Sequence, residues 1–292
     1  MKKAFLLLSL LSLYIACDNM QSPKDKETYN FVMRSYVEIG KVFDSIKAPY
    51  ILDFKNGQKR VVFVGCEHQA DTNHKQFLEI ERLFDDLNPQ ITFNEGGQVA
   101  DSVHFPNRNE AIKKDGELAI LKYLSDKKGI KMMNGDLTDS LEFKYTLQRH
   151  SKQEMWLYYV IERGAIPYRF GENKGKPFET VFIDLVEHYF VKNGFPLTKE
   201  EKSFNYFKSL YKKYMGADFE IDNFDVEAFD YVNDNCFFCA IGRTSKMVRD
   251  SALLTKIDNA LDKYDRVMVT FGHGHALAIE PALKLLVEKK RN

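Results

Sequence analysis

Hydrophobic residues recur along this chain at two spacings, and the order of these spacings predicts the fold. Two β-rich runs, at 50–54 and 60–64, flank Asn56-Gly57, which is a strong hairpin signal. The second run is apolar throughout, as expected for a strand that is buried on both faces. Shorter apolar runs that also predict strands lie at 90–95, 130–133 and 266–272.

Amphipathic segments with helical spacing separate these strands. A first helix is expected over 28–46. A second has Thr72 or Asn73 as its N-cap and stops at Pro89. The remaining helices are expected at about 116–128 with Gly129 as the stop, at 245–264, and at 277–290 with Pro281 near its first turn. Strands that alternate with helices through short connections are typical of a mainly parallel α/β sheet flanked by helices.

The middle of the chain lacks strand signals. Residues from about 150 to 240 carry aromatic-rich amphipathic stretches such as FNYFKSLYKKYMG. We therefore expect a single α/β domain over 28–292 with a helical insertion or cap at about 150–240. The aromatic density of residues 195–235 leads to the hypothesis that this part shapes a substrate groove.

The N-terminus has the pattern of a bacterial lipoprotein signal. Lys2 and Lys3 precede an apolar run that is too short to span a bilayer, and Ala16 stands directly before Cys17. We expect a signal peptide at 1–16, a lipidated Cys17 that anchors the chain to a membrane of the bacterial cell envelope, and a polar tether at 17–27.

Charge and cysteine usage restrict the partners. The chain has 42 basic and 42 acidic residues, and loss of Lys2 and Lys3 leaves 40 against 42, so no nucleic acid is expected as a partner. Cys236 and Cys239 have the spacing of a redox or metal pair, but no second pair completes a thiolate metal site. A structural role, with or without a disulfide, is the favoured interpretation, with redox or metal chemistry as the alternative.

Residues suited to metal binding or proton transfer follow four of the predicted strands. Gly65-Cys66-Glu67-His68 and Gly272-His273-Gly274-His275 share one spacing: a strand, a glycine, two residues and a histidine. Glu95 and Asp136 follow the two strands between them. Because the carboxyl ends of parallel strands meet at one edge of a sheet, these side chains are expected to form one site. Two histidines with one or two carboxylates suit manganese, cobalt, zinc or iron.

These motifs carry a resemblance. VVFVGCEHQ, PQITFNEGG, the RD of MVRDSALL and VMVTFGHGHA resemble, in this order, the motifs of the TraB/TIKI-type proteins and of their clan with erythromycin esterases and ChaN-like haem-binding lipoproteins. DGELAILKYLSDKKGIKMMNGD is similar to the middle region of that clan. The resemblance covers roughly 55–165 and 240–288 and implies the erythromycin esterase/ChaN-like fold.

The resemblance implies a metal-dependent hydrolase, with a peptidase in the TIKI branch and a small-molecule or peptide substrate. His68, His275 and Glu95 would hold a divalent ion, with His273 as a competitor of His275. The residues expected to act in catalysis are Glu67 or Asp136, which would transfer protons, and Arg249, which would hold a substrate carboxylate or an oxyanion.

Each role has a plainer alternative. Glu67 reads equally as a solvated loop acid, Arg249 as half of a structural salt bridge, and Asp136 as the cap of a turn. Two other functions also stay open. One is a lipoprotein that binds haem or iron without turnover. The other is a metal-free, erythromycin-esterase-like hydrolase in which His68 is a general base aided by Glu67.

Overall fold

The structure is a computed structural model that describes residues 31–290. The expected signal peptide at 1–16, the tether at 17–27 and Cys17 lie outside the described residues. Their assignment stays a prediction.

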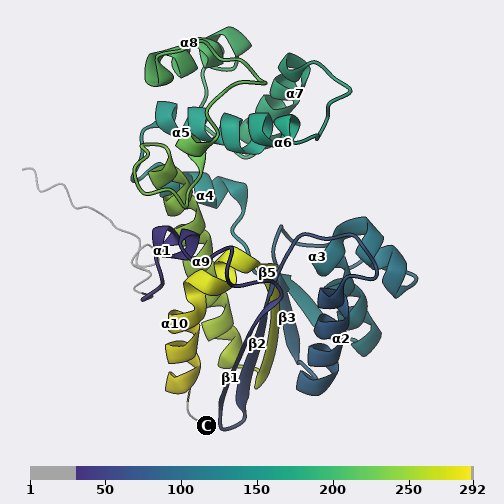
Figure 1. Ribbon diagram of the computed structural model, residues 1–292. Helices are drawn as coiled ribbons and strands as arrows, with labels where there is room; N and C mark the ends of the chain where they lie inside the picture. Colours follow the sequence, from purple (N-terminus) through teal and green to yellow (C-terminus); the bar gives the residue numbers. More distant parts are fainter. Residues whose placement is uncertain (1–30, 291–292) are drawn as a thin grey trace, which may run out of the picture. The chain divides into compact units, whose positions relative to one another are not determined.

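Five strands form one mixed sheet in the order β1-β2-β5-β3-β4 (Figure 1). Their bounds are β1 Tyr50–Asn56, β2 Lys59–Cys66, β3 Ile91–Asn94, β4 Lys131–Asn134 and β5 Arg266–Gly272. β2, β5, β3 and β4 run parallel to one another, whereas the edge strand β1 pairs antiparallel with β2. Gly57 in the connecting turn has a φ of 59°, which favours glycine. The predicted hairpin and the mainly parallel α/β sheet are both confirmed.

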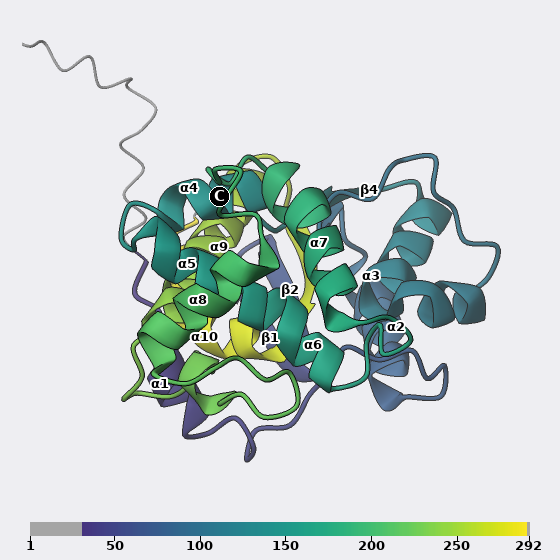
Figure 2. The same cartoon turned by 90° about the horizontal axis from the view of Figure 1, so that it is seen from above.

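Residues of the central strands alternate between two hydrophobic cores. Val61 and Phe63 of β2 face a core shared with α9 (Cys239–Leu261) and α10 (His273–Lys289). Val62 and Val64 face a second core, shared with α2 (Lys75–Leu87) and α3 (Arg108–Lys128). Figures 1 and 2 show the two helix pairs on opposite faces of the sheet. All four β2 side chains are fully buried, so the prediction of a strand buried on both faces is confirmed.

The expected opening helix over 28–46 is wrong for the residues that are described. α1 covers only Tyr36–Gly40, because Ser35 is its N-cap and forms a capping box with Glu38. Before that cap, the backbone N–H of Arg34 donates to the carbonyl of Ala278 at 3.0 Å, so the chain runs along α10 instead of coiling on itself.

Two helix boundaries also differ from expectation. α2 begins one or two residues later than predicted, with His74 in place of Thr72 or Asn73 as the N-cap. His74 makes no side-chain capping hydrogen bond, and the helix ends before a left-handed Asn88. α3 begins at Arg108 and contains a break at Asp115 and Gly116. Its predicted stop is confirmed, because Gly129 forms a left-handed C-cap with a φ of 66°.

α10 starts four residues earlier than the expected 277, so Pro281 lies inside the helix and not near its first turn. Proline has no N–H to give to the carbonyl of the residue four positions earlier. The Nη1 group of Arg34 donates to that carbonyl, on Leu277, at 3.3 Å. This contact from a distant segment replaces the missing helical hydrogen bond.

The central part of the chain is mainly helical and has its own core. Its helices are α4 Asp139–Thr146, α5 Lys152–Val160, α6 Ile166–Arg169, α7 Phe178–Leu185 and α8 Phe204–Met215, with π-helical turns at Ile161–Ala165 and Val186–Val191 and a 3-10 turn at Glu227–Phe229. Buried aromatic side chains dominate this core, with Trp156 and Phe190 rings 4.4 Å apart. Figure 1 shows these helices beyond one end of the sheet, where α4 and α5 contact α9.

Candidate functional site

The carboxyl ends of β2, β3 and β5 open into one cavity of about 400 Å³. The cavity contains four of the residues proposed from the sequence as metal ligands, together with a fifth proposed as a proton-transfer group. These residues are His68, Glu95, His273, His275 and Glu67. Asp136 and Arg249 do not line the cavity, but both are linked to it through Glu95. The topology therefore brings the proposed residues into one region.

Arg249 on α9 joins the two carboxylates that follow β3 and β4. Its Nε donates to Asp136 at 2.8 Å, and its Nη2 donates to Asp136 at 2.5 Å and to Glu95 at 2.6 Å. The side chains of Arg249 and Asp136 are only 7% and 9% exposed. Although burial opposes charge on Asp136, the hydrogen bonds of Arg249 keep the pKa of this carboxyl below its usual value.

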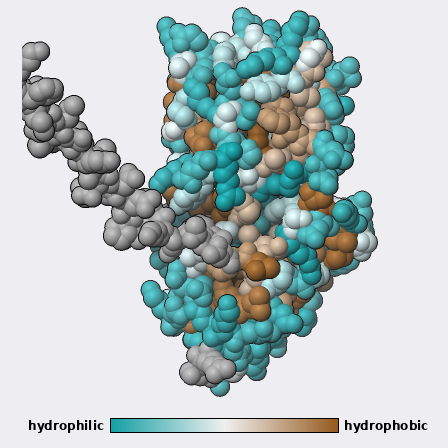
Figure 3. Space-filling model, turned by 90° about the vertical axis from the view of Figure 1, so that its left-hand side faces the viewer, coloured by the Kyte–Doolittle hydropathy of each residue, from teal (hydrophilic) through white to brown (hydrophobic). Residues whose placement is uncertain are grey.

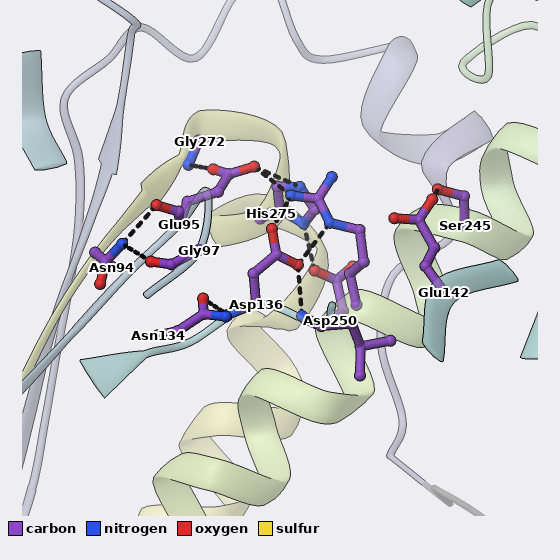
Figure 4. Close-up of polar contacts among 12 residues, drawn as sticks. Asn94, Glu95, Gly97, Asn134, Asp136, Glu142, Ser245, Asp250, Gly272 and His275 are labelled. Atoms are coloured by element: carbon purple, nitrogen blue, oxygen red, sulfur yellow. Dashed lines mark hydrogen bonds and ion pairs between the residues drawn. The ribbon is translucent and has the colours of Figure 1, made fainter. Parts of the chain in front are cut away.

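Glu95 lies at the meeting point of β3 and β5. Its Oε2 accepts from the backbone N–H of Gly272 at 2.6 Å (Figure 4). Its Oε1 accepts from Nη2 of Arg249. Burial acts to raise the pKa of the Glu95 carboxyl, but His275 and Arg249 outweigh it and hold the pKa well below its usual range. Gly96, with a φ of 87°, lets the backbone turn sharply directly behind this carboxylate.

His275 lies in the first turn of α10 and is held by two side chains. Its Nδ1 is 2.5 Å from Asp250 Oδ1 and 3.2 Å from the hydroxyl of Tyr36. The Tyr36 hydroxyl also donates to Asp250 at 2.7 Å. The opposite nitrogen, Nε2, has no hydrogen-bond partner in the described part of the chain and lies 3.5 Å from Glu95 Oε1. His275 is only 4% exposed, so this is an oriented, buried imidazole with one free nitrogen.

His68 stands at the rim of the cavity and has a carboxylate partner of its own. Its Nδ1 is 2.5 Å from Oε1 of Glu117 on α3, and its side chain is 75% exposed. The hydrogen bond to Glu117 raises the pKa of the His68 imidazole above its ordinary value. His68 and His275 thus share one arrangement, in which a carboxylate holds Nδ1.

The two other proposed residues are placed differently. His273 is 7% exposed, and burial lowers the pKa of its imidazole. Its ring lies 5.0 Å from that of Phe43, and within the described residues its Nε2 has no hydrogen-bond partner. Glu67 is exposed and does not contact His68 in hydrogen-bond geometry; its nearest basic partner is His74, at 3.9 Å.

Four residues of this region were given no role from the sequence. They are Tyr36, Glu117, Lys246 and Asp250, the last of which appeared only as part of the RD motif. Asp250 and Lys246 had a local signal, because positions 246, 249 and 250 share one helix face. Tyr36 and Glu117 had none, since they reach the site from other elements.

Cys236 and Cys239 form a disulfide, which is compatible with both the structural interpretation and the redox alternative. The bond lies at the N-terminus of α9, the helix that carries Arg249 and Asp250. Phe237, between the cysteines, is 61% exposed, whereas Phe238 is buried.

Compared with known proteins, the chain matches no family model, and neither the curated proteins nor the solved structures gave a significant match. Within residues 31–290, no helix is both long and apolar enough to cross a membrane. The face drawn in Figure 3 is covered mainly by hydrophilic residues, with hydrophobic residues in separate patches.

The same described residues contain no cluster of three His, Cys, Asp or Glu side chains arranged to hold a metal ion. The hydrogen bonds of the proposed ligands are one reason why these residues do not form such a cluster. Both oxygens of Glu95 already face partners, Arg249 and the Gly272 N–H, and the guanidinium charge opposes a nearby cation. The imidazoles of His68 and His275 suit a metal better, because a carboxylate holds Nδ1 of each and leaves Nε2 without a carboxylate bond.

Proposed function

We propose that the chain is a hydrolase in which His275 acts as the general base without a metal ion. One observation carries this proposal: His275 lines the cavity, is buried and oriented through Nδ1 by Asp250, and has an Nε2 without a hydrogen-bond partner among residues 31–290. A carboxylate that fixes one nitrogen of an imidazole and leaves the other for proton transfer is the arrangement found in hydrolase triads.

In the proposed reaction, Nε2 of His275 takes a proton from water as the water oxygen attacks a carbonyl carbon of the substrate. Asp250 keeps the proton of the neutral imidazole on Nδ1, and Glu95, 3.5 Å from Nε2, stabilises the imidazolium that forms. The bond to the leaving group then breaks, and the leaving group receives a proton. The products are an acid and an alcohol or amine.

His68 is proposed as the proton donor to the leaving group. Its pKa is raised by Glu117, so at neutral pH a larger share of His68 is protonated than of an ordinary histidine. Two histidines with different environments at one cavity allow acid and base roles at the same pH. In this proposal Arg249 positions Glu95 and Asp136, and Glu67 has no assigned role.

A metal-dependent hydrolase is the second candidate, favoured by the shared imidazole–carboxylate arrangement of His68 and His275. These two residues would hold a divalent ion (manganese, cobalt, zinc or iron), with His273 as a further nitrogen donor and Glu95 as a shared oxygen ligand. The ion would supply a water of lowered pKa.

We also propose that the chain is related to the TraB/TIKI-type or erythromycin esterase/ChaN-like proteins. The parallel strand order and the position of the two Gly-x-x-His motifs at one sheet edge support this relationship.

We also propose that Cys17 is lipidated and anchors the chain in the bacterial cell envelope. The parent chain should then be found in the membrane fraction of the cells, and a Cys17→Ala chain in the soluble fraction.

The test is an esterase and peptidase assay of the full chain, with p-nitrophenyl esters and aminoacyl p-nitroanilides, before and after treatment with a chelator. His275→Gln should lower kcat by at least about a hundredfold, the range for loss of a general base. His150→Gln is the matched control, because His150 bonds Thr244 at 2.8 Å and does not line the cavity.

Three outcomes separate the candidates. Activity that survives chelation and is lost in His275→Gln supports the metal-free hydrolase. Activity that chelation abolishes and an added metal restores supports the second candidate. No turnover, together with a Soret band on addition of haem, would replace both with a haem-binding lipoprotein.

A further inference from the structure

Lys246 is a cation in the cavity wall that lacks a counterion in the described chain. It lies on α9, one turn before Arg249, and lines the cavity together with Glu95 and His275. No carboxylate among residues 31–290 approaches its Nζ within 4.0 Å; instead, Nζ lies 5.0 Å from the ring centre of Tyr231. Burial, followed by the charge of Arg249, lowers the pKa of the Lys246 ammonium, and the more distant charges of Glu162 and Glu95 offset this only in part.

The N-terminus of α10 opens into the same cavity. Gly272 is its N-cap and contributes no side-chain hydrogen bond, and residues 272–275 all line the cavity. The first backbone N–H groups of a helix have no acceptor within the helix, and they carry a partial positive charge. The N–H of Gly272 is used by Glu95, which leaves those of the first turn beyond it.

Tyr231 connects these two features in space. Its ring contacts Lys246, and its hydroxyl lies 3.9 Å from the position that a Cβ on Gly274 would occupy. Tyr231 is therefore near Lys246 with its ring and near the first turn of α10 with its hydroxyl. His275 lines the same cavity, is 4% exposed and has an unpartnered Nε2 within the described residues, which is an independent indication of a ligand there.

We propose that the cavity takes a substrate with an anionic group, a carboxylate or a phosphate, held between the Lys246 ammonium and the N-terminal amides of α10. Arg249 is less suited to this role, because it does not line the cavity and its charge is already paired with Asp136 and Glu95. The other acidic side chains of the cavity, Asp44 and Glu67, are exposed at its rim, so the anion would be held deeper than they are.

The assignment of this anion as part of the substrate rests on the proposed hydrolase, whereas anion binding itself does not. Bound in this way, the anionic group places the neighbouring part of the substrate beside His275. Selectivity for anionic over neutral substrates would then come from Lys246, and the bond broken would be close to the charged end.

The first experiment is titration of the full chain with inorganic phosphate, and separately with succinate, by calorimetry. Lys246→Met should weaken binding of whichever anion binds by at least about tenfold, which is the loss of one charge-assisted contact. Lys246→Arg should retain most of the affinity. Lys208→Met is the matched control, because its Nζ also lies 5.0 Å from an aromatic ring centre, that of Phe204, but outside this cavity.

Unchanged affinity in Lys246→Met, or failure of the parent chain to bind either anion, would overturn the anion site. A second measurement compares kcat/KM for p-nitrophenyl hemisuccinate and p-nitrophenyl butyrate. Lys246→Met should lower the ratio of anionic to neutral substrate by about tenfold. If Lys246→Met turns over both esters with an unchanged ratio, the anion site is refuted while the proposed hydrolase is not. If the parent chain binds an anion but His275→Gln keeps full turnover, His275 is refuted as the general base while the anion site is not.

Discussion

Removal of the Arg249 charge should destabilise the fold strongly, because two buried carboxylates depend on it. In Arg249→Met, Asp136 and Glu95, whose side chains are 9% and 17% exposed, keep their positions but lose their cation. Removing one partner of a buried ion pair costs about 3–5 kcal/mol, since the remaining charge is left without compensation. The free energy of unfolding should fall by that amount at pH 7.

The chain provides a matched control at its surface. Arg60 uses the same donors, with Nε and Nη2 on Asp53 and Nη2 also on Asp86 at 2.7 Å. Here the carboxylates are 38% and 54% exposed, so water screens them. Arg60→Met should therefore cost about 1 kcal/mol or less.

The difference in unfolding free energy between the parent chain and Arg249→Met should depend on pH in a predictable direction. The folded-state pKa values of Glu95 and Asp136 lie below their unfolded values of about 4, so in the parent chain their stabilisation is present above pH 4 and is lost as pH falls through the folded pKa values. In Arg249→Met, burial without the guanidinium raises the pKa of Asp136, while His275 still acts on Glu95, so the variant loses stability as pH rises above about 4 mainly through Asp136. The difference between parent and variant should be largest near neutral pH and shrink in acid.

The assay is urea denaturation of the full chain, followed by circular dichroism, at pH 7 and pH 4. A loss of less than about 1 kcal/mol at pH 7 would refute the reasoning, because that value is typical of an exposed pair. A difference that is equal at the two pH values would also refute it, since it would point to lost packing instead of uncompensated charge.

Three further predictions concern the site and its supports. Asp250→Asn should lower kcat of the proposed hydrolase by about 10²–10⁴ while the circular dichroism spectrum is unchanged, because the imidazole loses the acceptor that orients it; an unaltered kcat would remove Asp250 from the mechanism. Reduction of the Cys236–Cys239 bond should lower the free energy of unfolding by about 2 kcal/mol, the value for a very short loop, as measured by denaturation with and without a reductant. The Cys236→Ser, Cys239→Ser double variant should show no response to the reductant. Gly116→Ala should destabilise the chain by at least about 1–2 kcal/mol, because the φ of 45° disfavours a side chain and the new Cβ would overlap the carbonyl of Gln69; a neutral result in thermal denaturation would mean that the break in α3 can relax.

The sequence predicted those parts of the fold that depend on neighbours along the chain. β5 spans the predicted 266–272, the Asn56-Gly57 hairpin forms as expected, and Gly129 ends its helix. Hydrophobic period and glycine conformation decide such features locally. Element starts were less predictable: α1 is short because Ser35 caps it, and α10 begins at His273 although a proline follows within the helix.

For the site, the sequence determined which chemistry is available and at which strand ends it lies, because the carboxyl ends of adjacent parallel strands share one edge of a sheet. It could not determine which other side chains form hydrogen bonds or ion pairs with the site residues. Tyr36 reaches Asp250 across 214 positions, and Glu117 reaches His68 across 49, so no spacing rule connects them. Only the packing of α9, α10 and α3 on the sheet decided that Arg249 is taken up by two carboxylates and that Lys246 lies free in the cavity wall of the described chain. An ion pair forms between whichever charges the fold brings within reach, and that distance is a property of the tertiary structure.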